Sequence, residues 1–314
     1  MTPALAVDAG QTEIRVALTG ERDPHGTAHA PGVMRLDGAA VDADQVAGAL
    51  VAAVEALGPL PAVAAIGVGL SGFEAAREDD LRRVDEILRA RVGAPQVTIA
   101  SDGVTSLLGA LGERPGAVVA AGTGTVCVAR GPRRWAKVDG WGSLLGDSGS
   151  GFAIGRSGLA AALRELDGRG GSKALLAAAE QRFGPGAGLA EAVYRSAVPT
   201  RTVASFARDV ARVAAAGDAV ARSILDAAGS ELALTACAAI ARALDPEDRA
   251  AVSYAGNVFE AGPPLMDAFA RELARRRPDV ELLPPEGDAL AGAALLAKRG
   301  AGLAPDRSLL WSST

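Results

Sequence analysis

Short apolar runs alternate with longer stretches of helical periodicity in the first hundred residues. Residues 5–7 and 14–18 are strand-like and flank the polar segment "DAGQT", which predicts two strands joined by a tight turn. The run 63–70 is apolar and bounded by turn residues, as expected for a buried strand. Residues 96–103 predict a further strand.

Two helices are expected between these strands. Residues 46–57 repeat Val, Leu and Ala at helical spacing and are followed by Gly58 and Pro59. Residues 78–93 begin with acids, end with bases and finish on a glycine, an order that complements the helix dipole. Strands that alternate with helices predict an α/β fold, and the tight turns add antiparallel character.

A second strand–turn–strand unit lies at residues 116–131, with the turn "AGTGT" in place of "DAGQT". Two such units, roughly a domain apart, indicate a duplicated architecture. The pattern then becomes mostly helical, with helices expected over residues 159–167, 173–183, 202–216 and 219–244.

The last sixty residues predict two strands and two helices. The strands are expected at 252–255 and around 280–283, and a helix starts at Pro263. The final helix spans 288–299, with Asp288 as its N-cap. The tail 301–314 is polar and contains proline, and we expect it to be poorly packed.

Composition narrows the possible partners. The 314 residues suggest two domains, and 49% hydrophobic residues provide for two cores. The net charge of −5 argues against a nucleic-acid partner, which would require a basic face. No signal peptide is visible and no apolar run approaches the ~20 residues of a membrane span, so we expect no membrane partner. Cys127 and Cys237 lie far apart, which favours a reducing, cytoplasmic location.

The turn "DAGQT" has the chemistry of a phosphate loop. Gly10 allows close backbone approach, Thr12 adds a hydroxyl donor, and Asp8 could hold Mg²⁺ or its water shell. A plain hairpin with Asp and Gly as turn formers would look the same. The later turn Gly122–Thr125 offers similar groups, and the pairing of the two turns is more informative than either one.

Asp102 and the stretch 140–155 add chemistry that could act on a hydroxyl. Asp102 ends a predicted strand, where α/β sheets place their ligands and where a carboxylate can accept a proton; it could also simply cap the next helix. The stretch "GWGSLLGDSGSGFAIG" combines many glycines with an indole, an acid and serines, which suits a polyol such as a sugar. An irregular loop leading into a helix is the alternative.

The segments "DAGQTEIR", "SDGVTSLLGA", "AGTGT", "GWGSLLGDSGSGFAIG" and "AGNVF" resemble, in order and spacing, the BadF/BadG/BcrA/BcrD ATPase family, and within it the N-acetylglucosamine kinases. The resemblance covers about residues 5–297. It implies two actin-like (ribonuclease H-like) α/β domains with a central cleft. The first would span 1–103 plus the helix at about 288–299, and the second 104–287.

The resemblance also implies roles for individual residues. Asp8 would face Mg²⁺ and Asp102 would be the catalytic base. The residues implied to bind ATP are Gly10, Gln11, Thr12, Gly122, Thr123, Gly124, Gly256 and Asn257. The residues implied to bind the sugar are Ser71, Asp102, Trp141, Gly142 and Asp147.

Three positions depart from the family pattern. Ala9 stands where a glycine is usual, Ser148 replaces an acid, and Val126 stands where animal N-acetylglucosamine kinases carry an asparagine. The last two leave the sugar open among N-acetylglucosamine, glucosamine, N-acetylmuramic acid and a plain hexose. The cysteines lack the pattern of the iron–sulfur members of the family.

The expected function is therefore an ATP- and Mg²⁺-dependent amino-sugar kinase, which phosphorylates the 6-hydroxyl of N-acetylglucosamine and forms a homodimer as relatives do. A regulatory ATPase on the same scaffold is the first alternative, but it would not need the loop Trp141–Asp147. A repressor-type relative would need a DNA-binding helix pair before the first phosphate loop, which starts too early in this chain.

Overall fold

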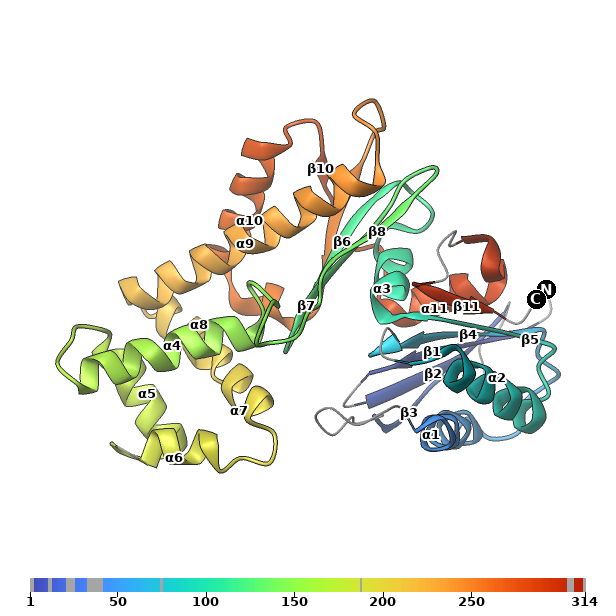
Figure 1. Ribbon diagram of the computed structural model, residues 1–314, viewed down its shortest axis with the longest axis horizontal. Coiled ribbons are helices and arrows are strands. Elements are labelled where there is room, and N and C mark those ends of the chain that lie inside the picture. Colours follow the sequence, from blue (N-terminus) through green and yellow to red (C-terminus); the bar gives the residue numbers. More distant parts are fainter. Residues whose placement is uncertain are drawn as a thin grey trace. The chain divides into compact units, whose positions relative to one another are not determined.

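The computed structural model describes residues 3–10, 13–20, 26–32, 42–73, 76–186, 188–303 and 308–312. They form two compact α/β units, each built around one sheet (Figure 1). The first unit comprises Met1–Pro115, Arg130–Trp135 and Pro284–Thr314, and the second Gly116–Ala129 and Ala136–Leu283. This division differs from the boundary expected after residue 103, because helix α3 (Asp102–Leu111) packs within the first unit.

The sheet of the first unit contains six strands within the described residues. In spatial order they are β11 (Leu310–Ser312), β5 (Gln96–Ser101), β4 (Ala65–Leu70), β1 (Ala4–Ala9), β2 (Glu13–Thr19) and β3 (Thr27–Pro31). Strands β1, β4 and β5 are parallel, whereas β2 is antiparallel to both of its neighbours. The carboxyl ends of β1, β4 and β5 therefore meet at one edge of the sheet.

The second sheet repeats this strand order. Its strands are β10 (Glu281–Leu282), β9 (Ala251–Ala255), β6 (Gly116–Ala121), β7 (Thr125–Arg130) and β8 (Trp135–Asp139). Each sheet places three consecutive strands side by side and has two later strands, parallel to the first, on its other side; the first sheet continues beyond them with the antiparallel strand β11. The duplication indicated by the two turns is thus present in the topology.

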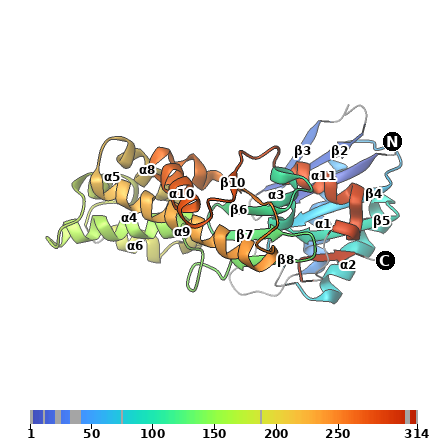
Figure 2. The same cartoon turned by 90° about the horizontal axis from the view of Figure 1, so that it is seen from above.

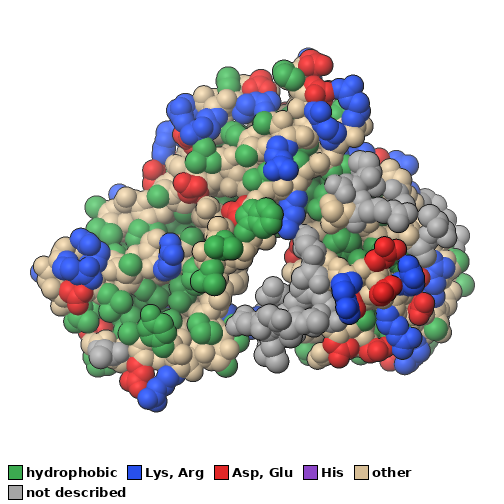
Figure 3. Space-filling model, in the orientation of Figure 1, with side chains coloured by type: hydrophobic (Ala, Val, Ile, Leu, Met, Phe, Trp, Pro, Cys, Tyr) green, Lys and Arg blue, Asp and Glu red, His purple; other side chains and the backbone are tan. Residues whose placement is uncertain are grey.

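Helices cover both faces of the first sheet. Helices α1 (Ala43–Glu55) and α2 (Glu78–Val92) share a core with alternate residues of β1. Asp42 caps α1 by accepting the N–H of Gln45, and Gly93 ends α2 in the left-handed region. Figure 3 shows acidic and basic side chains interspersed over the outer surface of this pair, where ion pairs join the two helices.

The opposite face is covered by α3 and α11 (Ala289–Arg299), which approach each other closely because glycines face each other at the contact. A Cβ on Gly292 would lie 1.8 Å from the carbonyl oxygen of Thr105, and one on Gly109 would lie 1.9 Å from that of Asp288. Gly67 on β4 likewise leaves no room for a side chain beneath α11. These contacts fix the beginning of α11 beside the sheet.

The second unit is mainly helical outside its sheet (Figure 2). Its helices are α4 (Gly151–Leu166), α5 (Lys173–Phe183), α6 (Gly188–Tyr194), α7 (Pro199–Ser205), α8 (Ala207–Ala215), α9 (Ala219–Ala243) and α10 (Pro263–Arg276). In the described part of the chain, α9 alone is long and apolar enough to cross a membrane, which the sequence analysis did not expect. Half of its most apolar window is buried in the unit, as in the core helix of a globular protein.

Two helix predictions differ from the structure in their bounds. Helix α4 begins at Gly151, because the side chain of Ser150 accepts the N–H of Ala153, and the helix expected from residue 159 is its second half. The helix expected over 202–216 is interrupted at Phe206, where α7 ends and α8 begins.

The expectation of a poorly packed tail was wrong. Leu310–Ser312 form strand β11 antiparallel to β5, and Leu309 and Leu310 are only 3% and 6% exposed. The polar composition concealed a short apolar segment that covers the free edge of β5. Two further short helical turns are η2 (Asn257–Ala261) and η3 (Gly300–Leu303).

Replacing Gly292 by alanine should separate α3 from α11. Since the new Cβ would overlap the Thr105 carbonyl, we expect a loss of about 3 kcal/mol in the free energy of unfolding, measured by denaturant titration. Gly48→Ala is the matched control, because its Cβ meets no atom within 4 Å and α1 should gain about 0.5–1 kcal/mol. Equal effects of the two changes would contradict this role for the glycine contact.

Candidate active site

Three predicted site residues follow the parallel strands of the first sheet. Gly10 follows β1, Ser71 follows β4 and Asp102 follows β5, and the register aligns these strand ends. The N–H of Ser71 donates to the carbonyl of Ala9 at 2.9 Å, which ties the end of β4 to the first turn. The hydroxyl of Ser71 donates to Oδ2 of Asp102 at 2.6 Å. The fold thus joins two residues that are 31 positions apart in the sequence.

Asp102 is the first residue of α3, and Ser101 takes the N-cap position. A carboxylate in the first turn of a helix is stabilised by the positive end of the helix dipole. The hydroxyl of Thr105 donates to the backbone carbonyl of Asp102 at 3.1 Å, which fixes the start of the helix. Asp102 is half-buried, so its carboxylate lies at the sheet edge where a ligand can reach it.

Gly10 closes the first turn. Its N–H donates to the carbonyl of Glu13 at 2.9 Å, and a Cβ would lie 3.1 Å from the same oxygen. Small residues are therefore favoured at this position. Gln11 and Thr12, also predicted to contact phosphate, lie outside the described residues.

Asp8 belongs to an ion-pair chain that the sequence analysis missed. Arg15, its cross-strand partner, donates from Nη2 and Nε to Oδ2 of Asp8 at 2.6 and 3.1 Å. The other arm of Arg15 reaches Oδ2 of Asp288, the N-cap of α11, at 2.5 Å. Burial raises the pKa of Asp8 and the guanidinium opposes that shift. At Asp288 the Ala291 N–H and Arg15 outweigh burial, and the pKa falls below its usual value.

Asp8 fits the coordination habits of Mg²⁺ in nucleotide sites. Both bonds from Arg15 go to Oδ2, so Oδ1 takes no part in the ion pair. A single carboxylate of this kind suits Mg²⁺, which keeps several waters and is held by one or two carboxylates together with substrate phosphates.

In the second unit, the turn Gly122–Gly124 is bonded to the start of α4. The N–H of Gly122 donates to the carbonyl of Gly124 at 2.9 Å, which makes the turn tight. The N–H groups of Gly151 and Phe152 donate to the carbonyls of Gly122 and Thr123 at 2.8 and 3.1 Å. Because α4 takes up these two carbonyls, the turn that contains Thr123 is held in one conformation.

Gly256 and Asn257 lie beside this turn because β9 is parallel to β6, and both strands end at the same edge. Gly256 has a φ of 93°, and a Cβ there would lie 2.3 Å from the carbonyl of Ala121. The side-chain oxygen of Asn257 lies 3.9 Å from the position that a Cβ of Gly122 would occupy. The predicted second phosphate turn and adenosine loop are therefore neighbours.

The loop between β8 and α4 carries the predicted sugar residues. Trp141 and Gly142 are exposed, whereas Asp147 is buried. Burial raises the pKa of Asp147, and hydrogen bonds with backbone groups of Thr125 and Gly142 partly offset that rise. A Cβ on Gly124 would lie 2.6 Å from a carboxylate oxygen of Asp147, so the loop packs directly on the phosphate turn.

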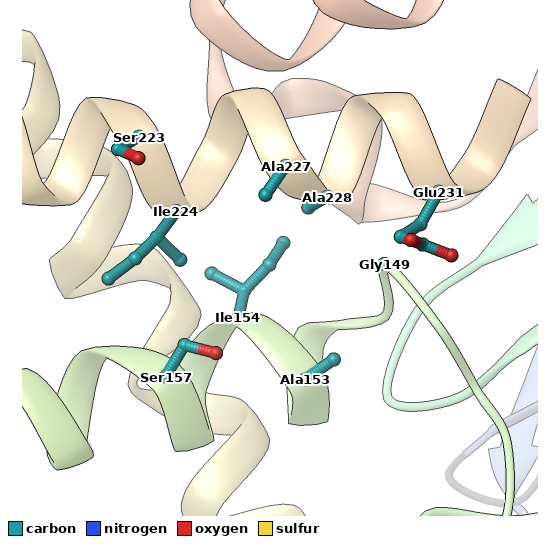
Figure 4. A pocket seen from close by; sticks show the side chains of 9 residues that line it. All are labelled: Gly149, Ala153, Ile154, Ser157, Ser223, Ile224, Ala227, Ala228 and Glu231. Atoms are coloured by element: carbon teal, nitrogen blue, oxygen red, sulfur yellow. The ribbon is translucent and has the colours of Figure 1, made fainter.

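A pocket of about 280 Å³ lies between α4 and α9 (Figure 4). Ile154 and Ile224 point into it from the two helices, and Glu231 lies beside Gly149 at one end. The predicted site residues do not line this pocket. The sequence analysis did not detect this pocket, because it lies between two helices that are far apart in the sequence.

Comparison with known proteins identifies the family of this chain. The family described as the BadF/BadG/BcrA/BcrD ATPase family matches the chain over residues 5–297. The chain belongs to this family.

Proteins similar to this chain include kinases of amino sugars. An N-acetylmuramic acid/N-acetylglucosamine kinase from Clostridium acetobutylicum is 30% identical over 238 residues, covering 74% of this chain and 77% of that protein. A crystal structure from Chromobacterium violaceum, provisionally named as an N-acetylglucosamine kinase, has a TM-score of 0.74 and 28% identity over 94% of this chain and 99% of its own.

A more distant structure shows the fold alone. The ROK family glucokinase from Streptomyces griseus has a TM-score of 0.61 and 18% identity, covering 95% of this chain and 100% of its own. The predicted fold class of two actin-like α/β domains is confirmed for this member of the ATPase family.

Replacing Arg15 by glutamine should destabilise the family member in a pH-dependent way. The change leaves the half-buried Asp8 carboxylate without its cation, and we expect a loss of roughly 1–3 kcal/mol in the free energy of unfolding at neutral pH. Because Arg15 lowers the pKa of Asp8, its removal lets that pKa rise further, and the deficit should shrink on acidification as Asp8 takes up a proton. Denaturant unfolding at pH 7.5 and pH 5 measures the loss in the free energy of unfolding relative to the wild type. A loss of the same size at both pH values would contradict the electrostatic role.

Proposed function

We propose that this family member, a sugar kinase, transfers the γ-phosphate of ATP to the 6-hydroxyl of N-acetylglucosamine. The Ser71–Asp102 pair carries the proposal, since a hydrogen bond of 2.6 Å holds the Asp102 carboxylate at the carboxyl edge of the first sheet. A carboxylate held there can accept the proton of an attacking hydroxyl, as an aspartate does in protein kinases. The name of the relative from Clostridium acetobutylicum supports an amino sugar as the acceptor.

The first unit would contribute the base and one phosphate turn. Asp102 takes the hydroxyl proton, and Ser71 orients its carboxylate. Gly10, with Gln11 and Thr12, would offer donors to phosphate oxygens. Asp8 would hold the hydrated Mg²⁺ of the nucleotide, and the ion would offset negative charge on the phosphates.

The second unit would contribute the other phosphate turn, the adenosine loop and the sugar loop. The turn Gly122–Gly124 would donate backbone N–H groups to phosphate oxygens, which lowers the energy of the charge that develops during transfer. Gly256 and Asn257 would contact the adenosine. In the sugar loop, Trp141 would cover an apolar face of the pyranose ring. Asp147 would accept hydrogen bonds from the sugar hydroxyls.

A regulatory ATPase on the same scaffold is the main alternative. It would use the two turns and Asp8 but would have no need for an indole and a carboxylate on one glycine-rich loop. The presence of Trp141 and Asp147 on that loop favours the kinase. Homodimer formation and a cytoplasmic location stay predictions of the sequence.

A sugar panel tests the proposal directly. ADP release would be measured with ATP and Mg²⁺ in the presence of N-acetylglucosamine, N-acetylmuramic acid, glucosamine or glucose. We expect N-acetylglucosamine to stimulate release most strongly, and phosphorus NMR of the product to show the phosphate on O6. Greater stimulation by another sugar would reassign the substrate, and ATP use that no sugar stimulates would support the regulatory alternative.

Asp102→Asn should remove the base while preserving the fold. We expect kcat to fall by about 10²–10⁴, the usual contribution of general-base catalysis. ATP affinity, measured by calorimetry with a non-hydrolysable analogue, should not fall, because the substitution removes a negative charge and so adds no repulsion to the phosphates.

The control for this substitution is Asp85→Asn. Asp85 is a buried aspartate of the first unit, paired with Arg89 on α2. Its replacement should lower stability and leave kcat unchanged. A kcat of Asp102→Asn near that of the wild type would exclude Asp102 as the base.

A further inference from the structure

Two aspartates at the ends of the sugar loop have unusual backbone conformations. Among the described residues, Asp139 and Asp147 are the non-glycine residues with positive φ, at 62° and 58°. This left-handed region is uncommon for residues with a side chain, and such strain persists only where the surroundings enforce it. Both strained residues lie in one loop, which indicates that the conformation of this loop is specified in detail.

The carboxylate of Asp139 joins the two ends of the loop. Its Oδ1 accepts the N–H of Gly140 at 2.9 Å and the N–H of Asp147 at 2.8 Å. Its Oδ2 accepts the N–H of Ser148 at 3.0 Å. A carboxylate that accepts three backbone N–H groups forms strong, charge-assisted bonds. Since Asp139 is also the last residue of β8, these bonds fix the loop to the second sheet.

The interior of the loop is built around this carboxylate. A Cβ on Gly146 would lie 2.4 Å from Oδ1 of Asp139, so the chain passes close over it only because residue 146 is glycine. The N–H of Gly146 donates to the carbonyl of Gly142 at 2.8 Å and closes the turn at the tip. The loop therefore has a fixed base and a fixed tip.

The tip presents large apolar side chains to solvent. Trp141, Leu144 and Leu145 are 76%, 93% and 87% exposed. An unanchored loop of this composition would tend to fold back and bury these side chains, whereas exposed apolar groups of this kind mark binding surfaces. Holding them out before the ligand arrives lowers the entropy lost on binding.

Asp139 also determines where Asp147 points. The bond from the N–H of Asp147 to Asp139 holds the backbone of residue 147 in its left-handed conformation. That conformation turns the Asp147 carboxylate towards the backbone of Thr125 and Gly142 and against Gly124. Asp147 thus links the sugar loop to the turn Gly122–Gly124, and Asp139, which the sequence analysis did not single out, holds Asp147 in place.

We propose that Asp139 is a positioning residue, which fixes the loop of Trp141, Gly142 and Asp147 in its sugar-binding conformation before the sugar binds. The proposal rests on the proposed function, because it takes these three residues as the sugar site. Asp139 acts through the backbone of the loop and not through contact with the reacting atoms.

Asp139→Gly tests this role without unfolding the second unit. Glycine adopts a φ of 62° without strain, so the substitution removes the three hydrogen bonds and relieves the strained conformation at the same time. We expect the KM for N-acetylglucosamine, and its Kd measured by calorimetry without ATP, to rise about tenfold, while the KM for ATP stays within about twofold. Asp139→Asn keeps one acceptor oxygen and should give an intermediate increase.

Hydrogen exchange provides a readout that does not depend on activity. In Asp139→Gly the amides of Gly140, Asp147 and Ser148 should exchange at least about tenfold faster, whereas amides in the core of α9 should not change. Asp218→Ala is the matched control. Asp218 caps α9 in the same unit by accepting the N–H of Ala221 at 2.8 Å, so its loss should lower stability and leave the sugar KM unchanged.

Two results would overturn the positioning role. In the first, the loop amides of Asp139→Gly exchange faster but the Kd for sugar equals that of the wild type. In the second, the KM values for sugar and for ATP rise together, which would indicate a general structural defect. Unchanged exchange of the three amides would disprove the anchoring itself. If the wild type binds no sugar of the panel, the proposed function fails and the positioning role fails with it, whereas sugar binding that is insensitive to Asp139 contradicts the positioning role alone.

Discussion

Direct backbone contact at glycines is the constraint on which the candidate site residues of each unit depend. In the first unit, Gly109 and Gly292 let α3 and α11 touch, which places Asp288 where Arg15 can bridge it to Asp8. In the second unit, a side chain at Gly256 would meet the end of β6, and one at Gly151 would meet the phosphate turn. Glycine adds no packing area of its own, but it lets polar backbone groups approach closely enough to form a rigid site.

The two sheets use the same strand order for different chemistry. At the carboxyl edge of the first sheet, the polar groups are side chains: the Asp102 carboxylate with its Ser71 donor, and Asp8 with its cation. At the corresponding edge of the second sheet, the turn after β6 and the glycine after β9 consist mainly of backbone. The first unit thus presents side-chain groups and the second presents backbone donors, and the proposed phosphoryl transfer would use both kinds of group.

The role of each of three aspartates depends on the groups that its carboxylate contacts. Asp8, Asp139 and Asp147 are all acidic residues near predicted loops, but one is paired with a guanidinium, one accepts three backbone N–H groups, and one is buried against a turn. Burial raises the pKa of Asp8 and Asp147, and in each case the hydrogen-bond partners of the carboxylate oppose that rise. Residue type alone could not have separated these roles.

The sequence by itself determined the local elements and the candidate chemistry. Apolar periodicity predicted most strands and helices, and the paired turns predicted the duplicated architecture, because these features depend on neighbouring residues. Tertiary structure decided what depends on distant contacts: the Ser71–Asp102 hydrogen bond, the bridge from Arg15 to Asp288, the strand formed by the tail, and the anchoring of the loop by Asp139. Such partners are set by strand order and helix packing, and the periodicity of a single segment carries no information about them.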